Sequence, residues 1–222
     1  MNQALSFLRQ LAANNNREWF NENKSLYREA LEEFTSVMER VLDGIREFDP
    51  HLRDISAKES IFRIYKDVRF SKDKSPYKTH FGCWMTKGGR KSEDAGYYFH
   101  LEPGATFLAG GSWMPPSARL KLIREEIMFN TKNYLDIIRD PEFISRYERT
   151  GKEDMLKKGP AGFPKDFEHL EELKYKHYVY SRNYTDKEVL TPDLAVRICE
   201  DFKGLHPLVE WLNHTMSFTG NE

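Results

Sequence analysis

The segment Arg63–Lys78 (RIYKDVRFSKDKSPYK) concentrates side chains that could bind a charged ligand. It carries six basic residues and two acidic ones, a net charge of +4, whereas the whole chain has a formal net charge of −1. Guanidinium and ammonium groups bind phosphate and carboxylate through charge-assisted hydrogen bonds. The segment therefore predicts a site for an anion, with Arg63, Arg69, Lys72 and Lys78 as the side chains that bind it.

Groups able to transfer protons lie within this segment and near it. Asp67 and Asp73 would orient the basic side chains or act as acid or base, and His100 adds an imidazole. Tyr98 precedes His100 by two residues, so both side chains share one face if 96–101 is a strand. Aromatic residues, Tyr77 and Tyr98 among them, suit a pocket wall. The alternatives are a structural His100 bonded to backbone and a solvated hairpin whose arginines pair with nearby acids.

Sequence motifs for metals, nucleophiles and cofactors are missing. The histidines form no HExxH or comparable ligand set, so we expect no metal site, although ligands distant in the sequence stay open. There is no GxSxG elbow, and the glycine pairs at 88–89 and 110–111 fit turns or bulges rather than phosphate loops. The cofactor and the question of enzymatic activity are therefore left open.

Composition narrows the class of protein. Cys83 and Cys199 are too few and too far apart for a disulfide framework, so we expect reduced thiols. No apolar run approaches the roughly 20 residues of a membrane-spanning helix, and the N-terminus lacks a secretory signal pattern. The near-neutral net charge disfavours nucleic acid as a partner. We expect a cytoplasmic protein that contacts no membrane.

Two periodicities along the chain predict the elements that would position these groups. Helical spacing covers 16–47 and, near the N-terminus, Leu5, Leu8 and Leu11. Short alternating runs separated by turns follow between residues 60 and 114, as in an antiparallel meander. Strands are expected at 61–70, 79–85, 96–101, 106–110 and 176–182, and later helices at 117–128, 134–138, 142–149 and from 191, the last bent or restarted at Gly204–Pro207.

This order of elements predicts an α+β fold in which a central antiparallel β-meander is flanked by N-terminal and C-terminal helices. We expect a single domain over residues 1–222, because a chain of this length buries most of its apolar surface in one core. The stretch 150–165, rich in Gly, Lys and Pro, would be a loop or a connector between lobes.

Several blocks of sequence resemble the motifs of a family known as domain of unknown function 2461. These blocks are NNNREWF at 14–20, DVRFSKDKSPYK at 67–78, GYYFHLEPG at 96–104, KGPAGF at 158–163 and PLVEWL at 207–212. The resemblance covers nearly the whole chain and implies a shared fold with an unassigned function. It carries across no catalytic residue, ligand or cofactor, but it favours a functional use of Arg63, Asp67, Arg69, Lys72, Asp73 and Lys78.

Two hypotheses of function follow. In the first, the protein binds an anionic small molecule, bearing phosphate or carboxylate, in a basic and aromatic pocket that contains the arginines. In the second, it is a non-enzymatic interaction module whose basic hairpin contacts an acidic protein surface or RNA, with exposed arginines and salt-sensitive binding. We favour the first, because the aromatic residues around the basic segment fit a pocket wall.

Overall fold

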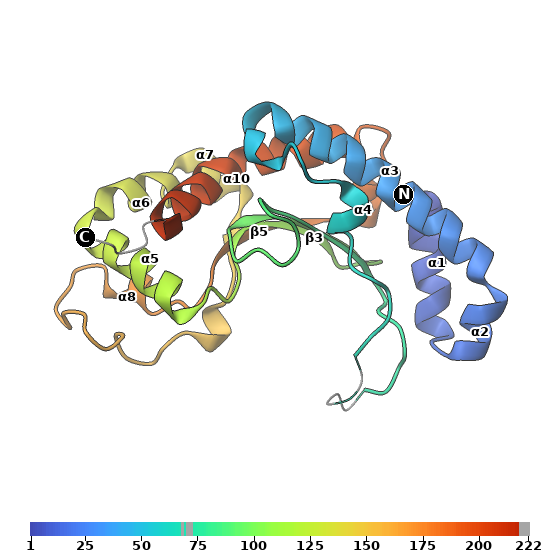
Figure 1. The fold of residues 1–222 in the computed structure, drawn as a ribbon, viewed down its shortest axis with the longest axis horizontal. Helices are drawn as coiled ribbons and strands as arrows, with labels where there is room; N and C mark the ends of the chain where they lie inside the picture. Colours follow the sequence, from blue (N-terminus) through green and yellow to red (C-terminus); the bar gives the residue numbers. More distant parts are fainter. Residues whose placement is uncertain (68, 70–72, 218–222) are drawn as a thin grey trace. The chain divides into compact units, whose positions relative to one another are not determined.

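The computed structural model of the protein describes residues 1–67, 69 and 73–217 (Figure 1). The chain divides into two compact units, each assembled from separate stretches of sequence. The first unit comprises Met1–Arg90, Tyr98–Leu108 and Asn183–Glu200. The second comprises Lys91–Tyr97, Ala109–Arg182 and the chain from Asp201 onward, and the stretch 150–165 lies within it.

In the described part of the chain, five strands form one antiparallel sheet in the order β1–β2–β3–β5–β4. The first three strands are neighbours in sequence and in the sheet, as in a meander, whereas β5 pairs with the two-residue β4, placing Glu148 opposite Ser181. The predicted α+β fold is confirmed. The strands are β1 (Phe81–Met85), β2 (Gly96–Leu101), β3 (Thr106–Ser112), β4 (Glu148–Arg149) and β5 (Tyr178–Tyr184).

The first unit contains most of the N-terminal helices. They are α1 (Asn2–Ala13), α2 (Arg17–Glu22), α3 (Lys24–Phe48), the 3-10 helix η1 (Pro50–Leu52) and α4 (Ala57–Ser60), with α9 (Asp186–Val189) joining later. The single helix predicted over 16–47 is wrong in one respect, because the structure divides it at Asn23. The Asn23 backbone N–H donates the last helical bond of α2 to Trp19 O at 3.0 Å, and the Asn23 side chain donates to the same oxygen at 2.8 Å, a local bond that competes with continuation of the helix.

Helix α3 lies over one face of the strands of the first unit (Figure 1), and its buried apolar side chains contact them. Phe34, Met38 and Val41 are fully buried. The Phe34 ring lies 5.3 Å from Phe81 in β1 and 6.3 Å from Phe99 in β2, measured between centroids. Since side chains alternate along a strand, β2 must present Tyr98 and His100 to the opposite face.

The predicted strand over 61–70 is wrong as a continuous strand. The described part of this segment forms only isolated bridges, Ile61 opposite Cys83 and Tyr65 opposite Tyr77. Pro76 has no N–H to donate, so the ladder between the two arms cannot continue through it, although its carbonyl accepts from Lys66 N at 2.9 Å. Residues 68 and 70 of the predicted strand lie outside the described residues.

The second unit contains α5 (Ser117–Phe129), α6 (Thr131–Ile138), α7 (Pro141–Arg146), η2 (Lys152–Asp154) and α8 (Leu170–Leu173). The helix expected over 142–149 ends at Arg146, and the chain then enters β4. The final helix, α10 (Leu194–Ser217), shows no restart and includes Pro207. A Cβ at Gly204 would lie 2.2 Å from the Tyr147 hydroxyl, so this glycine serves close packing rather than a break.

Within the described residues, every helix is too short or too polar to cross a membrane.

Candidate functional site

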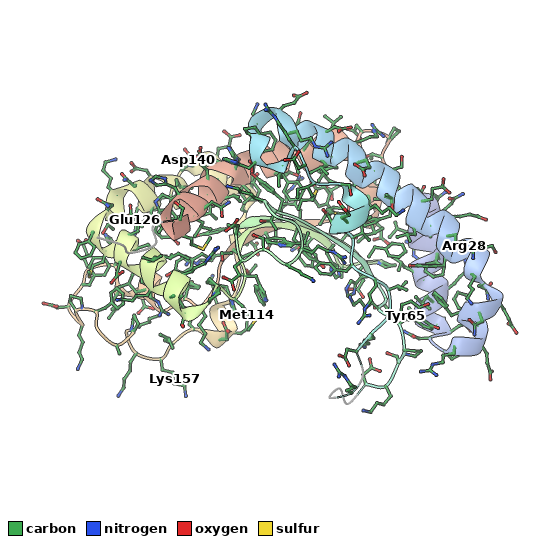
Figure 2. All side chains as sticks on the ribbon, in the orientation of Figure 1. Arg28, Tyr65, Met114, Glu126, Asp140 and Lys157 are labelled. Carbon is green, nitrogen blue, oxygen red and sulfur yellow. The ribbon has the colours of Figure 1, made fainter. Side chains whose placement is uncertain are left out.

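The base of the basic segment is anchored to the N-terminal helices. The Asn15 side chain donates to Tyr77 O at 3.0 Å and accepts from Tyr77 N at 3.1 Å. The Tyr77 ring stacks on Phe20 with centroids 4.0 Å apart and is only 4% exposed. Tyr77 was predicted to bind a ligand, but its ring packs in the core, where its face contacts Phe20. Tyr65, which pairs with it and is labelled in Figure 2, is 52% exposed.

Two local ion pairs occupy the acidic residues of the segment. Asp67 binds the Arg69 guanidinium through both oxygens, at 3.0 and 2.7 Å, and the Arg69 side chain is 76% exposed. Asp73 Oδ2 lies 2.5 Å from Lys66 Nζ. Hydrogen bonds from Arg69 and Lys66, respectively, lower the pKa of Asp67 and Asp73, so both carboxyls are ionised at neutral pH. Lys72 lies outside the described residues.

Two cations, Lys78 and Arg90, lie close to the ring of Phe62, and a third, Arg63, is near enough to Lys78 to act on it electrostatically. Lys78 Nζ lies 5.4 Å and Arg90 Cζ 5.7 Å from the ring centroid, and Arg90 Nη1 donates to Ile61 O at 2.9 Å. Burial lowers the pKa of the Lys78 ammonium, and repulsion from Arg63 and Arg90 lowers it further. Among the described residues, none of these three cations forms an ion pair with an acid. We call Arg63, Lys78, Arg90 and Phe62 the basic surface.

The outer face of β2 holds a second cluster, made of His80, His100 and Glu102. Tyr97, Phe99 and Leu101 are fully buried, whereas His100 is 9% exposed and Glu102 is half-buried. The His80 and His100 rings lie 4.2 Å apart, and His100 Nε2 lies 3.1 Å from Glu102 Oε2.

Neighbouring side chains hold two members of this cluster in place. The Tyr98 hydroxyl lies 3.0 Å from His100 Nδ1, and Thr79 Oγ1 donates to Glu102 Oε1 at 2.7 Å. The ring of Phe107 in β3 stacks on His100 with centroids 4.7 Å apart. These contacts fix the imidazole of His100 on both edges and one side.

The charge state of the cluster follows from its burial. Burial lowers the pKa of His80 to about 4, with the nearby His100 as a further cause, and burial also lowers the pKa of His100. Burial raises the pKa of Glu102, but hydrogen bonds from Thr79 and His100 outweigh it and the net shift is downward. At neutral pH both imidazoles are neutral and Glu102 is a carboxylate. His100 therefore donates a hydrogen bond from Nε2 to Glu102 and accepts one at Nδ1 from the Tyr98 hydroxyl.

The structure brings some of the predicted site residues together and places others in local ion pairs. Arg63 and Lys78 belong to the basic surface, and Phe62 connects it to Tyr98, whose ring centroid lies 6.4 Å away. Arg69, Asp67 and Asp73 are engaged in local pairs. The sequence reasoning overlooked Arg90 and Thr79 as site residues and treated His80 only as an unassigned histidine. It also overlooked Glu102, although alternation along β2 places it on the face of His100.

A family model described as a conserved hypothetical protein, DUF2461, matches residues 3–211. The chain belongs to this family. The predicted family is thereby confirmed over nearly the whole chain. Neither the curated proteins nor the solved structures contain a match. Membership of DUF2461 carries no assigned ligand or reaction, so function must be argued from the residues themselves.

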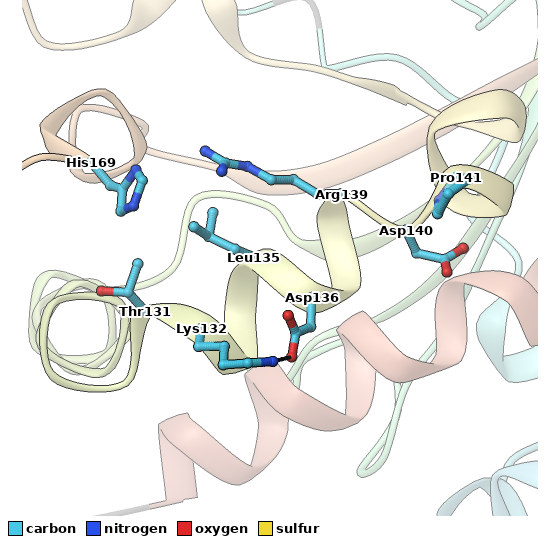
Figure 3. Close-up of a pocket in the computed structure, with 8 residues that line it drawn as sticks. All are labelled: Thr131, Lys132, Leu135, Asp136, Arg139, Asp140, Pro141 and His169. Atoms are coloured by element: carbon cyan, nitrogen blue, oxygen red, sulfur yellow. Dashed lines mark hydrogen bonds and ion pairs between the residues drawn. The ribbon is translucent and has the colours of Figure 1, made fainter.

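The second unit of this DUF2461 protein has a surface hollow along α6 and the start of α7, close to His169 (Figure 3). Its acidic groups have structural roles. Asp136 pairs with Lys132, and Asp140 caps α7 by accepting from Glu142 N and Phe143 N. The hollow contains none of the predicted site residues, and its charged groups do not converge on one point in Figure 3.

The second unit also contains a buried cation. Arg149 is 7% exposed, its guanidinium lies 3.4 Å from the centroid of the Tyr175 ring, and it forms an ion pair with Glu172. The rings of Tyr134, Tyr178 and Tyr180 lie within 6 Å of it. Enclosure by rings and an acid gives Arg149 a structural role.

Proposed function

We propose that this protein binds a small anionic molecule, bearing a phosphate or carboxylate group, at the basic surface. The observation that carries the proposal is the position of Lys78. Its ammonium is half-buried beside the guanidinium groups of Arg63 and Arg90, and Lys78 forms no ion pair with a described acid, although Asp67 attracts Arg63 at longer range.

Electrostatics explain why such a group would attract an anion. Like charges held close together repel one another, and partial burial reduces the screening by water. A bound anion would remove this repulsion and raise the pKa of Lys78 again. Guanidinium groups add hydrogen bonds of fixed geometry, which suit the oxygens of phosphate and carboxylate.

The proposed site contains fewer of the ligand-binding residues than the sequence predicted. Arg63 and Lys78 remain its centre, Arg90 joins them, and Tyr98 and His100 lie beside them on the same unit. Asp67 and Asp73 keep an orienting role through their ion pairs. Proton transfer by His100 would require its bonds with Tyr98 and Glu102 to rearrange, so we propose binding without a reaction.

One observation favours a second candidate function, an interaction module for an acidic protein surface or RNA. Arg63 is exposed, and Arg69 exposes 76% of its side chain although it pairs with Asp67. An exposed basic hairpin fits a macromolecular contact better than an enclosed pocket. Binding of this kind would weaken steeply with salt and would depend on Arg69.

Within the proposal we place the protein in the cytoplasm. Cys83 is buried and Cys199 is half-buried, and the two cysteines form no disulfide. Cysteines kept out of disulfides fit a reducing compartment.

The test is thermal unfolding of the chelator-treated protein with a panel of nucleotides, sugar phosphates, polyphosphate and carboxylates. A ligand at about 100 times its Kd stabilises by about 2.7 kcal/mol, which corresponds to a rise in Tm of roughly 5–10 °C for a chain of this length. We expect a selective rise in the wild type that Lys78→Met abolishes. Lys132→Met, which removes a lysine that is 83% exposed in the second unit, is the matched control.

A rise of equal size in Lys78→Met would refute the proposed site. If no compound shifts Tm and an acidic polymer or RNA binds in a way that depends on salt and on Arg69, the second function replaces the first.

A further inference from the structure

We propose that His80, His100 and Glu102 bind a divalent transition-metal ion. Each residue offers one ligand atom, and the three atoms all lie within 4.8 Å of one another. Two imidazoles and one carboxylate form a donor set that Zn²⁺ and its first-row neighbours accept. The sequence pointed to no such site, because His80 and His100 are separated by a turn and a strand and meet through the pairing of β1 with β2.

The spacing of the ligand atoms fits an ion after small side-chain rotations. An ion bound at about 2.0–2.2 Å by each ligand separates neighbouring ligand atoms by roughly 3–3.6 Å. His100 Nε2 and Glu102 Oε2 are already 3.1 Å apart. Only His80 has to approach, and its ring already lies against that of His100.

His80 is the residue that distinguishes a ligand set from a packed hydrogen-bond network. His100 and Glu102 satisfy each other and their neighbours without an ion. The ring nitrogens of His80, by contrast, form no hydrogen bond with any described residue, although the side chain is half-buried. A half-buried imidazole whose nitrogens bond no described residue, beside a carboxylate, is free to take an ion as its partner.

The surroundings of the cluster supply the orienting bonds that metal ligands need. Thr79 donates to the second oxygen of Glu102, leaving Oε2 for the ion. When the ion occupies His100 Nε2, the imidazole proton moves to Nδ1 and donates to the Tyr98 oxygen, so the same 3.0 Å contact is kept with its direction reversed. Partners of this kind fix ring orientation and strengthen the ligand.

Three protein ligands leave at least one coordination position for another donor. The Lys78 ammonium is close enough to His80 to influence it electrostatically, so the basic surface adjoins the cluster. An anion held there would supply an oxygen ligand to the ion. This connection rests on the proposed function, whereas the three protein ligands do not.

The experiment titrates chelator-stripped protein with Co²⁺, followed by visible absorption, and then with Zn²⁺ in competition with a chromogenic chelator. We expect one ion per chain, with affinity reduced at least 10-fold by His80→Ala and by Glu102→Gln. Thr79→Val keeps all three ligands and should weaken binding about 10-fold. His51→Ala, which removes an exposed histidine of the same unit, should change nothing.

Far-UV circular dichroism will verify that each variant is folded. The same metal titration of Lys78→Met tests whether metal binding depends on the proposed anion site. Metal binding retained in Lys78→Met, with anion binding lost, supports both proposals separately. Absence of saturable binding to the folded wild type overturns the metal site. So does an affinity that neither His80→Ala nor Glu102→Gln changes.

Discussion

Replacing Gly82 with alanine tests whether Tyr98 is held against His100 as the structure shows. A Cβ at position 82 would lie 2.6 Å from the Tyr98 hydroxyl and 3.1 and 3.2 Å from two carbons of its ring. The hydroxyl must therefore move, and its 3.0 Å contact with His100 Nδ1 is lost. The φ angle of Gly82 is not in the left-handed region, so alanine meets the side chain and not a strained backbone.

The magnitude follows from three contributions to the free energy of unfolding. Overpacking costs about 1–3 kcal/mol, and the lost hydrogen bond costs about 1 kcal/mol. Replacing glycine restricts the unfolded chain, which stabilises by about 0.4–1 kcal/mol. Gly82→Ala should thus destabilise the wild type by roughly 1–3 kcal/mol. In a Tyr98→Phe background, the atom that clashes most closely is gone and the cost should fall below about 1 kcal/mol.

The assay is urea unfolding of the wild type, both single variants and the double variant, with m-values compared to verify that the transition is unchanged. The four proteins form a double-mutant cycle, and we expect a coupling of about 1 kcal/mol or more in favour of the double variant. An equal cost of Gly82→Ala in both backgrounds would refute the placement of the Tyr98 hydroxyl over Gly82.

Three further predictions concern side chains that stabilise one or the other unit from within. Arg149→Met should lower the free energy of unfolding by about 3–5 kcal/mol, because it leaves the Glu172 carboxylate unpaired beside buried rings, and thermal or urea unfolding measures the loss. Burial raises the pKa of Tyr147 to about 12. The neutral phenol therefore contributes to the free energy of unfolding in full below pH 10, and this contribution is lost as the pH rises toward 12. Tyr147→Phe should reduce the fall in the free energy of unfolding between pH 10 and 12, measured by urea unfolding. Asn15→Ala removes both side-chain bonds to the Tyr77 backbone and should cost about 1–2 kcal/mol. Faster amide hydrogen exchange at Tyr77 would accompany it, and an unchanged rate would contradict the anchoring role.

The elements that the sequence predicted well are those set by local periodicity. Leu5, Leu8 and Leu11 repeat at helical spacing and are buried on α1, and β2 has the predicted bounds. The errors come from competing local bonds and from packing that a single sequence does not display. Asn23 bonds back to Trp19 and divides a helix that the apolar stripe alone makes continuous. Gly204 suggests a break in the helix, but the structure shows that a glycine is needed there because the Tyr147 hydroxyl packs against it.

In the candidate site too, the sequence predicts neighbours within one strand but not contacts between segments far apart in the chain. Alternation along β2 predicted that Tyr98 and His100 share one face, and the same rule would have placed Glu102 on that face. Contacts between strands depend on register, which the pairing of β1 with β2 sets. His80 reaches His100 only through that pairing, and Arg90 reaches Phe62 only because the chain returns beside the bridge between residues 61 and 83.

The position of the face that carries the candidate site is a consequence of the apolar face. Because side chains alternate with a period of two, burying Phe99 against α3 forces Tyr98 and His100 to the opposite face. A slip of one residue in β2 would exchange the two faces and bury an imidazole under Phe34, so the core selects against it. The imidazole and carboxylate of the proposed metal site are therefore positioned by residues that do not touch a ligand. Core substitutions that keep this register should leave the cluster assembled even where they lower stability.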